Sequence, residues 1–311
     1  MSATETASAG LVEVARSVAI TAAQRSGVRI EAVRDLDKLE AVRRVIDEVW
    51  RPDQNDPPVT RNMLRALTHA GNYSALAYLG EQVVGTCVAF LGVEPADTLH
   101  SHIAGVTAAG AGRHIGFALK LDQRVWALER GIPRITWTFD PLVRRNAFFN
   151  MHKLGAVARK YAVDFYGDMS DAINAGQRTD RLVVTWDLAA DSTVRACAGE
   201  AAEVDASQLL ASGAEAILDE VDGQPIAMPG AAASSTRLVR VPADIEALRL
   251  SDPELAIQWR HAVRDALGGQ LSDGWSVTGV SRDGYYVLAR CAQANSAVHH
   301  TMHARMGCDL S

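Results

Sequence analysis

The stretch from Leu99 to Arg130, LHSHIAGVTAAGAGRHIGFALKLDQRVWALER, decides the predicted fold, because it joins a strand, a glycine-bearing turn and a helix. Residues 99–106 are predicted to form the strand. Apolar side chains then recur at helical spacing over residues 115–130. Between these elements, Gly112 and Gly116 frame a turn. Its unpaired backbone NH groups, together with the positive end of the helix, can hold an anion.

Patterns on either side of this stretch extend it into an α+β unit. The runs Tyr73–Leu79 and Val83–Leu91 flank three residues, which is the spacing of an antiparallel hairpin. After the helix, Ile135–Phe139 is predicted as the next strand. The whole order is strand, two helices, three antiparallel strands, helix, strand, helix and two strands, which is typical of the α+β class.

The chain has 311 residues, about twice the roughly 150-residue prior for one domain. We predict an N-terminal extension over residues 1–27 and a main domain over residues 28–188. Residues 189–235 are rich in Ala, Ser, Gly and Asp, which favours a linker or loop region. Residues 236–311 are predicted to form a smaller C-terminal α+β domain.

Composition and charge exclude several classes of protein. With 48% hydrophobic and 22% charged residues, the chain is neither collagen-like nor disordered. A net charge of −6 argues against a nucleic-acid partner. The four cysteines contain no CxxC pair, which excludes zinc-ribbon and thioredoxin-like sites. Without a basic leader or an apolar run of about 18 residues, we expect a cytoplasmic protein with no membrane partner.

The window Ala111-Gly-Arg-His-Ile-Gly116 has neither the GxGxxG spacing of a Rossmann loop nor the Lys-Ser/Thr ending of a P-loop. It resembles the acyl-CoA signature Gln/Arg-x-x-Gly-x-Gly/Ala of the GNAT superfamily of N-acetyltransferases. The resemblance extends over residues 28–188 and includes the turn Lys153-Leu-Gly155. The segments 238–248 and 274–288 are similar to the additional region of a bacterial subgroup of predicted acyltransferases.

The resemblance implies a GNAT-like mixed, mostly antiparallel sheet flanked by helices, and acetyl-CoA or another acyl-CoA as co-substrate without a metal. It also implies a set of cofactor-binding residues, namely Val106, Ala111, Gly112, Arg113, His114, Ile115, Gly116, Asn146 and Phe149. Two of them depart from the signature. Ala111 stands in place of Gln or Arg, and His114 in place of Gly, so His114 must adopt a conformation that Gly reaches more easily. The alternative for this window is an ordinary helix start.

His100 and His102 are the candidate catalytic residues. Residues two apart in a strand share a face, so both imidazoles are expected to point the same way. A neutral imidazole can accept a proton from an ammonium substrate. The spacing is similar to the histidine pair of arylalkylamine N-acetyltransferases, a GNAT branch in which the pair serves as a proton path. We expect His102 to act as base and His100 as relay. The alternative is a pair of hydrogen-bonded structural histidines.

The sequence indicates the general acid and the acceptor-binding residues less clearly than the histidine pair. The position of the tyrosine acid that many GNAT enzymes use falls on Met151, while Tyr161 and Tyr166 are nearby in sequence. Trp50 and Arg51 fall where the family places its acceptor-binding loop. An aromatic ring with a guanidinium suits an amine that carries a carboxylate. A tryptophan that completes the apolar stripe of a helix is the alternative.

The sequence therefore predicts a GNAT-type N-acyltransferase that moves an acetyl or succinyl group to a small primary amine or amino acid by direct attack in a ternary complex. A homodimer is the candidate assembly. The alternative is a catalytically weakened acyl-CoA-binding or regulatory module, motivated by Ala111, His114 and the missing tyrosine.

Overall fold

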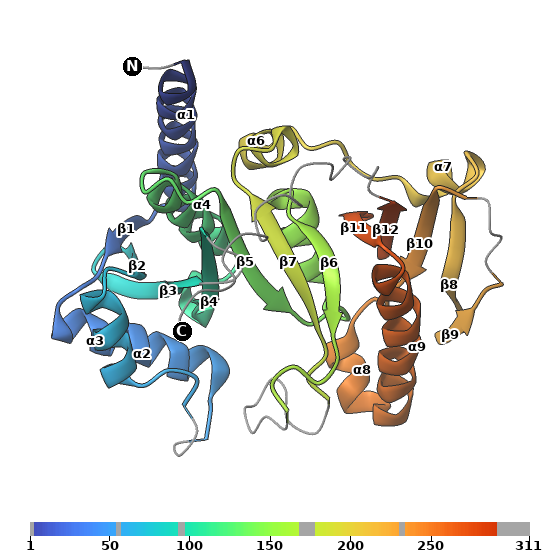
Figure 1. Ribbon diagram of the computed structural model, residues 1–311. Coiled ribbons are helices and arrows are strands. Elements are labelled where there is room, and N and C mark those ends of the chain that lie inside the picture. The colour runs from blue at the N-terminus through green and yellow to red at the C-terminus, as the bar shows by residue number, and fades with distance from the viewer. Residues whose placement is uncertain (1–2, 54–56, 93–96, 168–177, 230–233, 291–311) are drawn as a thin grey trace, which may run out of the picture.

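The computed structural model describes residues 3–53, 57–92, 97–167, 178–229 and 234–290. Twelve strands in this part of the chain form one continuous sheet, and helices cover both of its faces (Figure 1). The expected α+β class and the mixed, mostly antiparallel sheet are confirmed. None of the described helices combines the length and the apolar character needed to cross a membrane.

The first half of the sheet has the element order expected from the sequence. After α1 (Ala3–Ser26), the elements are β1 (Arg29–Ala32), α2 (Leu36–Trp50), α3 (Arg61–His69), β2 (Tyr73–Leu79), β3 (Gln82–Gly92), β4 (Thr98–Val106), α4 (Ile115–Leu128), β5 (Arg134–Phe139), α5 (Arg144–Phe148), β6 (Val157–Ala162) and β7 (Arg181–Asp187). The strands lie in the order β1-β2-β3-β4-β5-β7-β6. Only the β4–β5 contact is parallel among these neighbours.

The parallel contact between β4 and β5 is short. It consists of three residue pairs, the last of which joins His100 to Thr136. Both strands continue beyond this pair, β4 to Val106 and β5 to Phe139. The strands therefore run together at their beginnings and separate toward their carboxyl ends. We call the space between residues 101–106 and residues 137–139 the β4–β5 split.

Two helical layers enclose this part of the sheet. The helices α1 and α4 pack on one face, where Leu99, Ile115, Leu119 and Ile135 belong to the main core. On the other face, α2 and α3 enclose a separate apolar cluster, which consists of Val33, Leu39, Val42, Ile46, Val59, Leu64, Leu76, Val88 and Ile103. The split thus has an α4 face and an α2 face with different surroundings.

The prediction of a linker or loop over residues 189–235 is wrong. This region contains α6 (Asp191–Ala198), α7 (Ala206–Ala211), β8 (Glu215–Val221) and β9 (Gln224–Ala227). The alanines that suggested a loop are also the best helix formers, and both helices are too short to produce a clear apolar period. Further along the chain the structure has β10 (Thr236–Arg240), α8 (Ile245–Ser251), α9 (Pro253–Ser272), β11 (Trp275–Val280) and β12 (Tyr285–Arg290).

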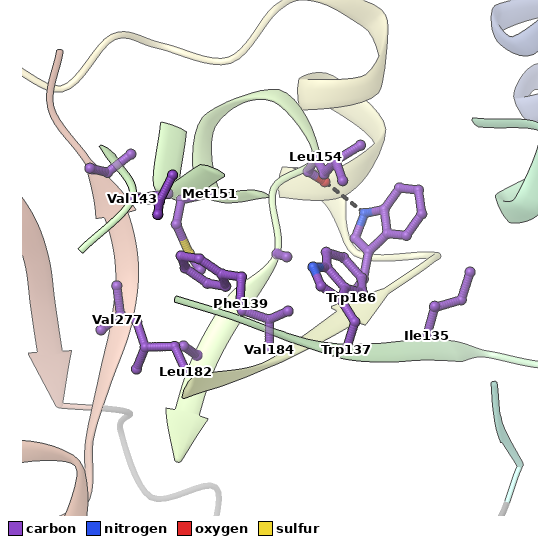
Figure 2. Close-up of a cluster of buried hydrophobic side chains, with 14 of the residues drawn as sticks. Ile135, Trp137, Phe139, Val143, Met151, Leu154, Leu182, Val184, Trp186 and Val277 are labelled. Carbon is purple, nitrogen blue, oxygen red and sulfur yellow. Dashed lines mark hydrogen bonds between the residues drawn. The ribbon is translucent and has the colours of Figure 1, made fainter. Parts of the chain in front are cut away.

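The C-terminal strands continue the same sheet. The pair Val277–Ala158 joins β11 to β6, and the order goes on as β11-β12-β10-β8-β9. Figure 2 shows Val277 of β11 beside Leu182 of β7, within one apolar cluster that also includes Phe139 at the end of β5. Residues 291–311 of the predicted C-terminal domain lie outside the described residues, and the predicted domain boundaries stay a prediction.

Charged side chains also attach the C-terminal region to the end of β5. Asp140 follows this strand and accepts hydrogen bonds from Arg249 of α8 at 2.6 Å and from Arg260 of α9 at 2.7 and 2.8 Å. Burial by itself would raise the pKa of Asp140. The two guanidinium groups outweigh burial and lower this pKa to about 2. The carboxylate is therefore ionised at every pH at which the protein is expected to work.

We predict that Asp140→Asn lowers the free energy of unfolding at pH 7 by about 3–5 kcal/mol, because it leaves two arginines in a buried site without their shared counter-charge. Urea unfolding measures the change. Because the pKa of Asp140 is lowered by folding, its contribution is present above about pH 4 and is lost as the pH falls toward about 2, so the two proteins should converge in acid.

The matched control is Arg282→Gln, which breaks the solvent-exposed ion pair with Glu203 and should change the stability far less. Equal losses in the two variants would show that the cluster around Asp140 is no more important than a surface ion pair.

Candidate functional site

The β4–β5 split leaves backbone groups without a strand partner. Along its whole length, β4 pairs with β3 on its other side, and β5 pairs with β7 from Arg134 to Phe139. Past the His100–Thr136 pair, the NH and C=O groups that the two strands direct toward each other have no ladder hydrogen bond. An extended ligand with amide groups can occupy this position and bond to the strand edges.

A β-bulge shapes the closed end of the split. In the β3–β4 ladder, Ala89 pairs with Ser101 and Val88 with Ile103, so His102 is the extra residue of β4. The rings of His100 and His102 lie 6.4 Å apart, and both approach Phe90 of β3, at 5.1 and 5.9 Å between ring centroids. The prediction that the two imidazoles share one side of the strand is confirmed.

Burial keeps both imidazoles uncharged at neutral pH. Burial, together with the neighbouring His102 and Lys120, lowers the pKa of His100 to about 4. Burial also lowers the pKa of His102, although a hydrogen bond to the carbonyl of Pro58 opposes this shift. A neutral imidazole retains one ring nitrogen that can accept a proton, which a general base requires.

The turn at the open end of the split contains residues with positive φ angles. Gly112 has a φ of 76°, and His114 has a φ of 59° and a ψ of 21° in the left-handed region. The sequence expectation for His114 is thus confirmed. Gly110 was not singled out from the sequence. A Cβ atom there would lie 2.7 Å from a Val106 side-chain carbon, so only glycine allows the turn to approach β4 this closely.

Five consecutive NH groups line this turn. Within the described part of the chain, no backbone or side-chain acceptor takes a hydrogen bond from the NH groups of residues 112–116, and His114 caps α4 without a side-chain hydrogen bond. Ala111 does donate its NH, to the carbonyl of Ala108. Free NH groups at the positive end of a helix form a site for an anion. The structure therefore brings together residues 112–116, whereas Ala111 contributes no free NH group.

The remaining predicted cofactor residues lie on the segment after β5. Phe149 packs edge-on against Phe117 of α4, with the ring centroids 6.5 Å apart, and Asn146 of α5 is exposed. Residues 149–153 form a π-helical turn, a feature that is frequent at functional sites. Phe149 therefore lies near the start of α4, at the open end of the split.

The tyrosine acid is replaced by a core residue. Met151 is buried, and Figure 2 shows its side chain against Phe139. The hydroxyl of Tyr161 donates to Asp180 at 2.8 Å. The hydroxyl of Tyr166 lies 3.2 Å from Oγ1 of Thr138, which is on the part of β5 that borders the split. Of these three residues, Tyr166 is the one whose polar atom lies beside the split.

The two predicted acceptor residues have different positions. A Cβ atom at Gly105 of β4 would lie 2.5 Å from two ring carbons of Trp50, so this ring lies directly against the split. Arg51 ends α2 with a φ of 47° and lines a surface pocket of about 500 Å³. Residues that line this pocket are Arg43, Asp47, Arg51, Pro52, Asp53, Pro57, Val59, Thr60 and Arg61. Its wall flanks Pro58, the residue that bonds His102.

Sequence reasoning missed a buried cation near the split. Lys120 of α4 has a relative exposure of 4% and donates hydrogen bonds to Ser101 and Gln123. Its position beside the apolar stripe of the helix is one where a lysine usually extends into solvent, so the sequence offered no signal. For metal ions, the described residues contain no group of three or more His, Cys, Asp or Glu side chains that could hold one.

Comparisons with known proteins add similarities of fold. No protein-family model and no curated protein matches the sequence. Among solved structures, an IAA acetyltransferase from Bacillus cereus matches with a TM-score of 0.39 and 16% identity, over 51% of this chain and 99% of that one. A putative acetyltransferase of the GNAT family from Desulfovibrio desulfuricans matches with a TM-score of 0.43 and 14% identity, over 52% and 99%.

A Bacillus subtilis acetyltransferase in complex with CoA matches with a TM-score of 0.40 and 17% identity, over 51% of this chain and 98% of that one. In each of these matches, about half of this chain aligns with nearly the whole of the other chain. At these identities the similarity concerns the fold.

We predict that the ring of His100 stays neutral down to about pH 5, because burial disfavours its charged form and lowers its pKa to about 4. Titration of the imidazole resonances by NMR, assigned with the variant His100→Gln, measures this value. A midpoint near the usual pKa of 6.5 would show that the ring of His100 is not buried at the closed end of the split.

Proposed function

We propose that this protein is an acyl-CoA-dependent N-acyltransferase that acts on a small primary amine or amino acid. The observation that supports this function most is the combination at the β4–β5 split. Its open end carries the five free NH groups of residues 112–116, and its closed end carries the neutral imidazoles of His100 and His102. An anion cradle and a base at opposite ends of the β4–β5 split suit a long anionic donor with its reactive group at the far end.

The donor would lie along the split. The NH groups of residues 112–116 would hold its pyrophosphate, because free NH groups and the helix end favour negative charge. The amide-rich pantetheine arm would bond to the unpaired edges of β4, with Phe149 near the start of α4 and Asn146 as a further partner in this proposal. An acyl-CoA is in this proposal a co-substrate, and no metal takes part.

The acyl transfer would begin with removal of a proton from the acceptor amine. The ring nitrogen of His102 would take a proton from the ammonium group of the acceptor, with His100 as relay. The neutral amine would then attack the thioester carbonyl, so that a C–N bond forms and the C–S bond breaks. The CoA thiolate would leave with the bonding electron pair. The nitrogen of the new C–N bond would then lose its second proton, and water or the Tyr166 hydroxyl would pass a proton to the thiolate, which yields the neutral amide and the CoA thiol.

The acceptor would approach from the α2 face. The ring of Trp50 forms a wall against Gly105, and the pocket of Arg51 begins beside Pro58, the hydrogen-bond partner of His102. Arg43 is held by Glu40 and Asp47, whereas Arg51 and Arg61 are exposed. Exposed guanidinium groups suit an acceptor that carries a carboxylate, such as an amino acid.

A second candidate is an acyl-CoA-binding or regulatory module without turnover. It is favoured by Met151, which is buried where an acid would be expected, and by the strained backbone of His114. Both candidates require the donor to bind, so they differ only in turnover with an amine.

We predict that acetyl-CoA binds with micromolar affinity and that the backbone of the turn decides this binding. His114→Gly should bind as tightly as the natural protein or more tightly, because Gly adopts a positive φ without strain. His114→Val should bind roughly tenfold more weakly, because a β-branched residue resists this conformation by about 1–3 kcal/mol. Calorimetric titration measures both affinities. Equal binding by the two variants would argue against the cradle.

We further predict that His102→Gln lowers turnover by roughly 10²–10⁴-fold, the usual effect of losing a general base, with little change in acetyl-CoA affinity. The assay follows release of the CoA thiol with a panel of primary amines and amino acids. His69→Gln, which changes an exposed histidine of α3, is the control. Full activity of His102→Gln would remove His102 from the mechanism, and no turnover by the natural protein with any amine would favour the binding module.

A further inference from the structure

The side chain of Lys120 brings a positive charge into the interior of the protein. Its Nζ atom donates to Oγ of Ser101 at 2.8 Å and to Oε1 of Gln123 at 3.0 Å. The same atom lies 3.8 Å from the centroid of a Trp137 ring and 5.9 Å from that of Trp186. The ammonium group thus connects α4 to β4 and to the aromatic side chains of β5 and β7.

This position is defined by the β4–β5 pairing. The last pair joins His100 to Thr136, so Ser101 and Trp137 are the first residues on either side of the split. Lys120 contacts both of them. The ammonium group therefore lies at the closed end of the split, on its α4 face. It is also close enough to His100 to lower the pKa of that imidazole.

Among the described residues, no carboxylate pairs with Lys120. The neighbours of Nζ are a hydroxyl, an amide and aromatic rings. Burial raises the pKa of the nearby Cys87 thiol to about 11, so this thiol is neutral as well. Burial lowers the pKa of Lys120 to about 8, which leaves it mostly protonated at pH 7.

Other buried cations of the described residues are stabilised in two ways: Arg124 donates only to the backbone carbonyl of Leu188, whereas two arginines are paired with carboxylates. Arg260, which is as buried as Lys120, is paired with Asp140, and Arg264 is paired with Asp180. A buried charge without a partner is costly, because neither water nor an anion stabilises it. Lys120 differs from Arg260 in this respect, and it lies at the end of the split where the proposed donor would place its acyl group. A ligand carboxylate would supply the absent charge.

We propose that Lys120 is a specificity-determining residue that binds the terminal carboxylate of a dicarboxylic acyl group, such as succinyl, carried by the CoA donor. This inference rests on the proposed function. The donor phosphates would lie at the open end beside residues 112–116, and the acceptor would lie on the α2 face near His102 and Trp50. The acyl chain beyond the thioester is therefore the part of the substrates that would extend to the closed end and reach Lys120.

The test compares two thioesters with the same four-carbon chain. Succinyl-CoA ends in a carboxylate and butyryl-CoA in a methyl group, so their difference in affinity reports the charge alone. Calorimetric titration of the natural protein should show a preference for succinyl-CoA of roughly tenfold to hundredfold, the range of a charge-assisted hydrogen bond. Lys120→Met should abolish this preference and leave butyryl-CoA binding unchanged.

Two further variants separate charge from packing. Lys120→Arg keeps the charge and should keep part of the preference, which a purely structural role would not predict. Lys160→Met removes an exposed lysine of β6 and should leave the preference intact. If Lys120→Met does not fold, equal binding of the two thioesters by the natural protein would still overturn the inference, and the partial preference of Lys120→Arg is the result that supports it.

Each outcome has a distinct meaning. Equal affinity of the natural protein for the two thioesters would overturn the role of Lys120 and leave the acyltransferase proposal standing. A preference that persists in folded Lys120→Met would place the carboxylate elsewhere and also overturn the inference. Binding of neither thioester would overturn the proposed function and this inference with it.

Discussion

The incomplete pairing of β4 with β5 is the constraint on which the rest of the site depends. Each strand is fully occupied on its outer side, β4 by β3 and β5 by β7. Neither strand can therefore move to close the split without breaking its other ladder. The three pairs that do form keep the two beginnings together, and the carboxyl ends remain apart. A permanent gap within a sheet offers aligned NH and C=O groups at no cost of opening.

The two faces of the split differ in chemistry because different helices cover them. On the α2 face, the bulge at His102 places two neutral imidazoles near the connection between α2 and α3. On the α4 face, Lys120 supplies a buried positive charge. In the proposed mechanism, proton acceptance and recognition of an anion would therefore occur on opposite faces of the sheet.

The C-terminal region braces this arrangement. Asp140 ends β5 and is held by Arg249 and Arg260, and the hydroxyl of Tyr286 in β12 donates to the carbonyl of Pro141 at 2.8 Å. The end of β5 that borders the split is therefore fixed by residues far along the chain. A role in positioning β5 gives a physical reason for the continuous sheet. The C-terminal region therefore helps to hold the end of β5 in place beside the split.

The sequence by itself determined the elements of the first half, the left-handed turn at His114 and the shared side of His100 and His102. These features depend on local periods and on the conformational limits of single residues, which neighbouring residues encode. Only the tertiary structure decided that Lys120 is buried, that Trp50 and Arg51 point to separate places, and that Asp140 meets arginines 109 and 120 residues away. Contacts between distant segments depend on how the sheet and helices pack, and no local pattern records them. The short elements α6 to β9 were not predicted, because they are stabilised by packing against the rest of the protein and are too short to show a hydrophobic period in the sequence.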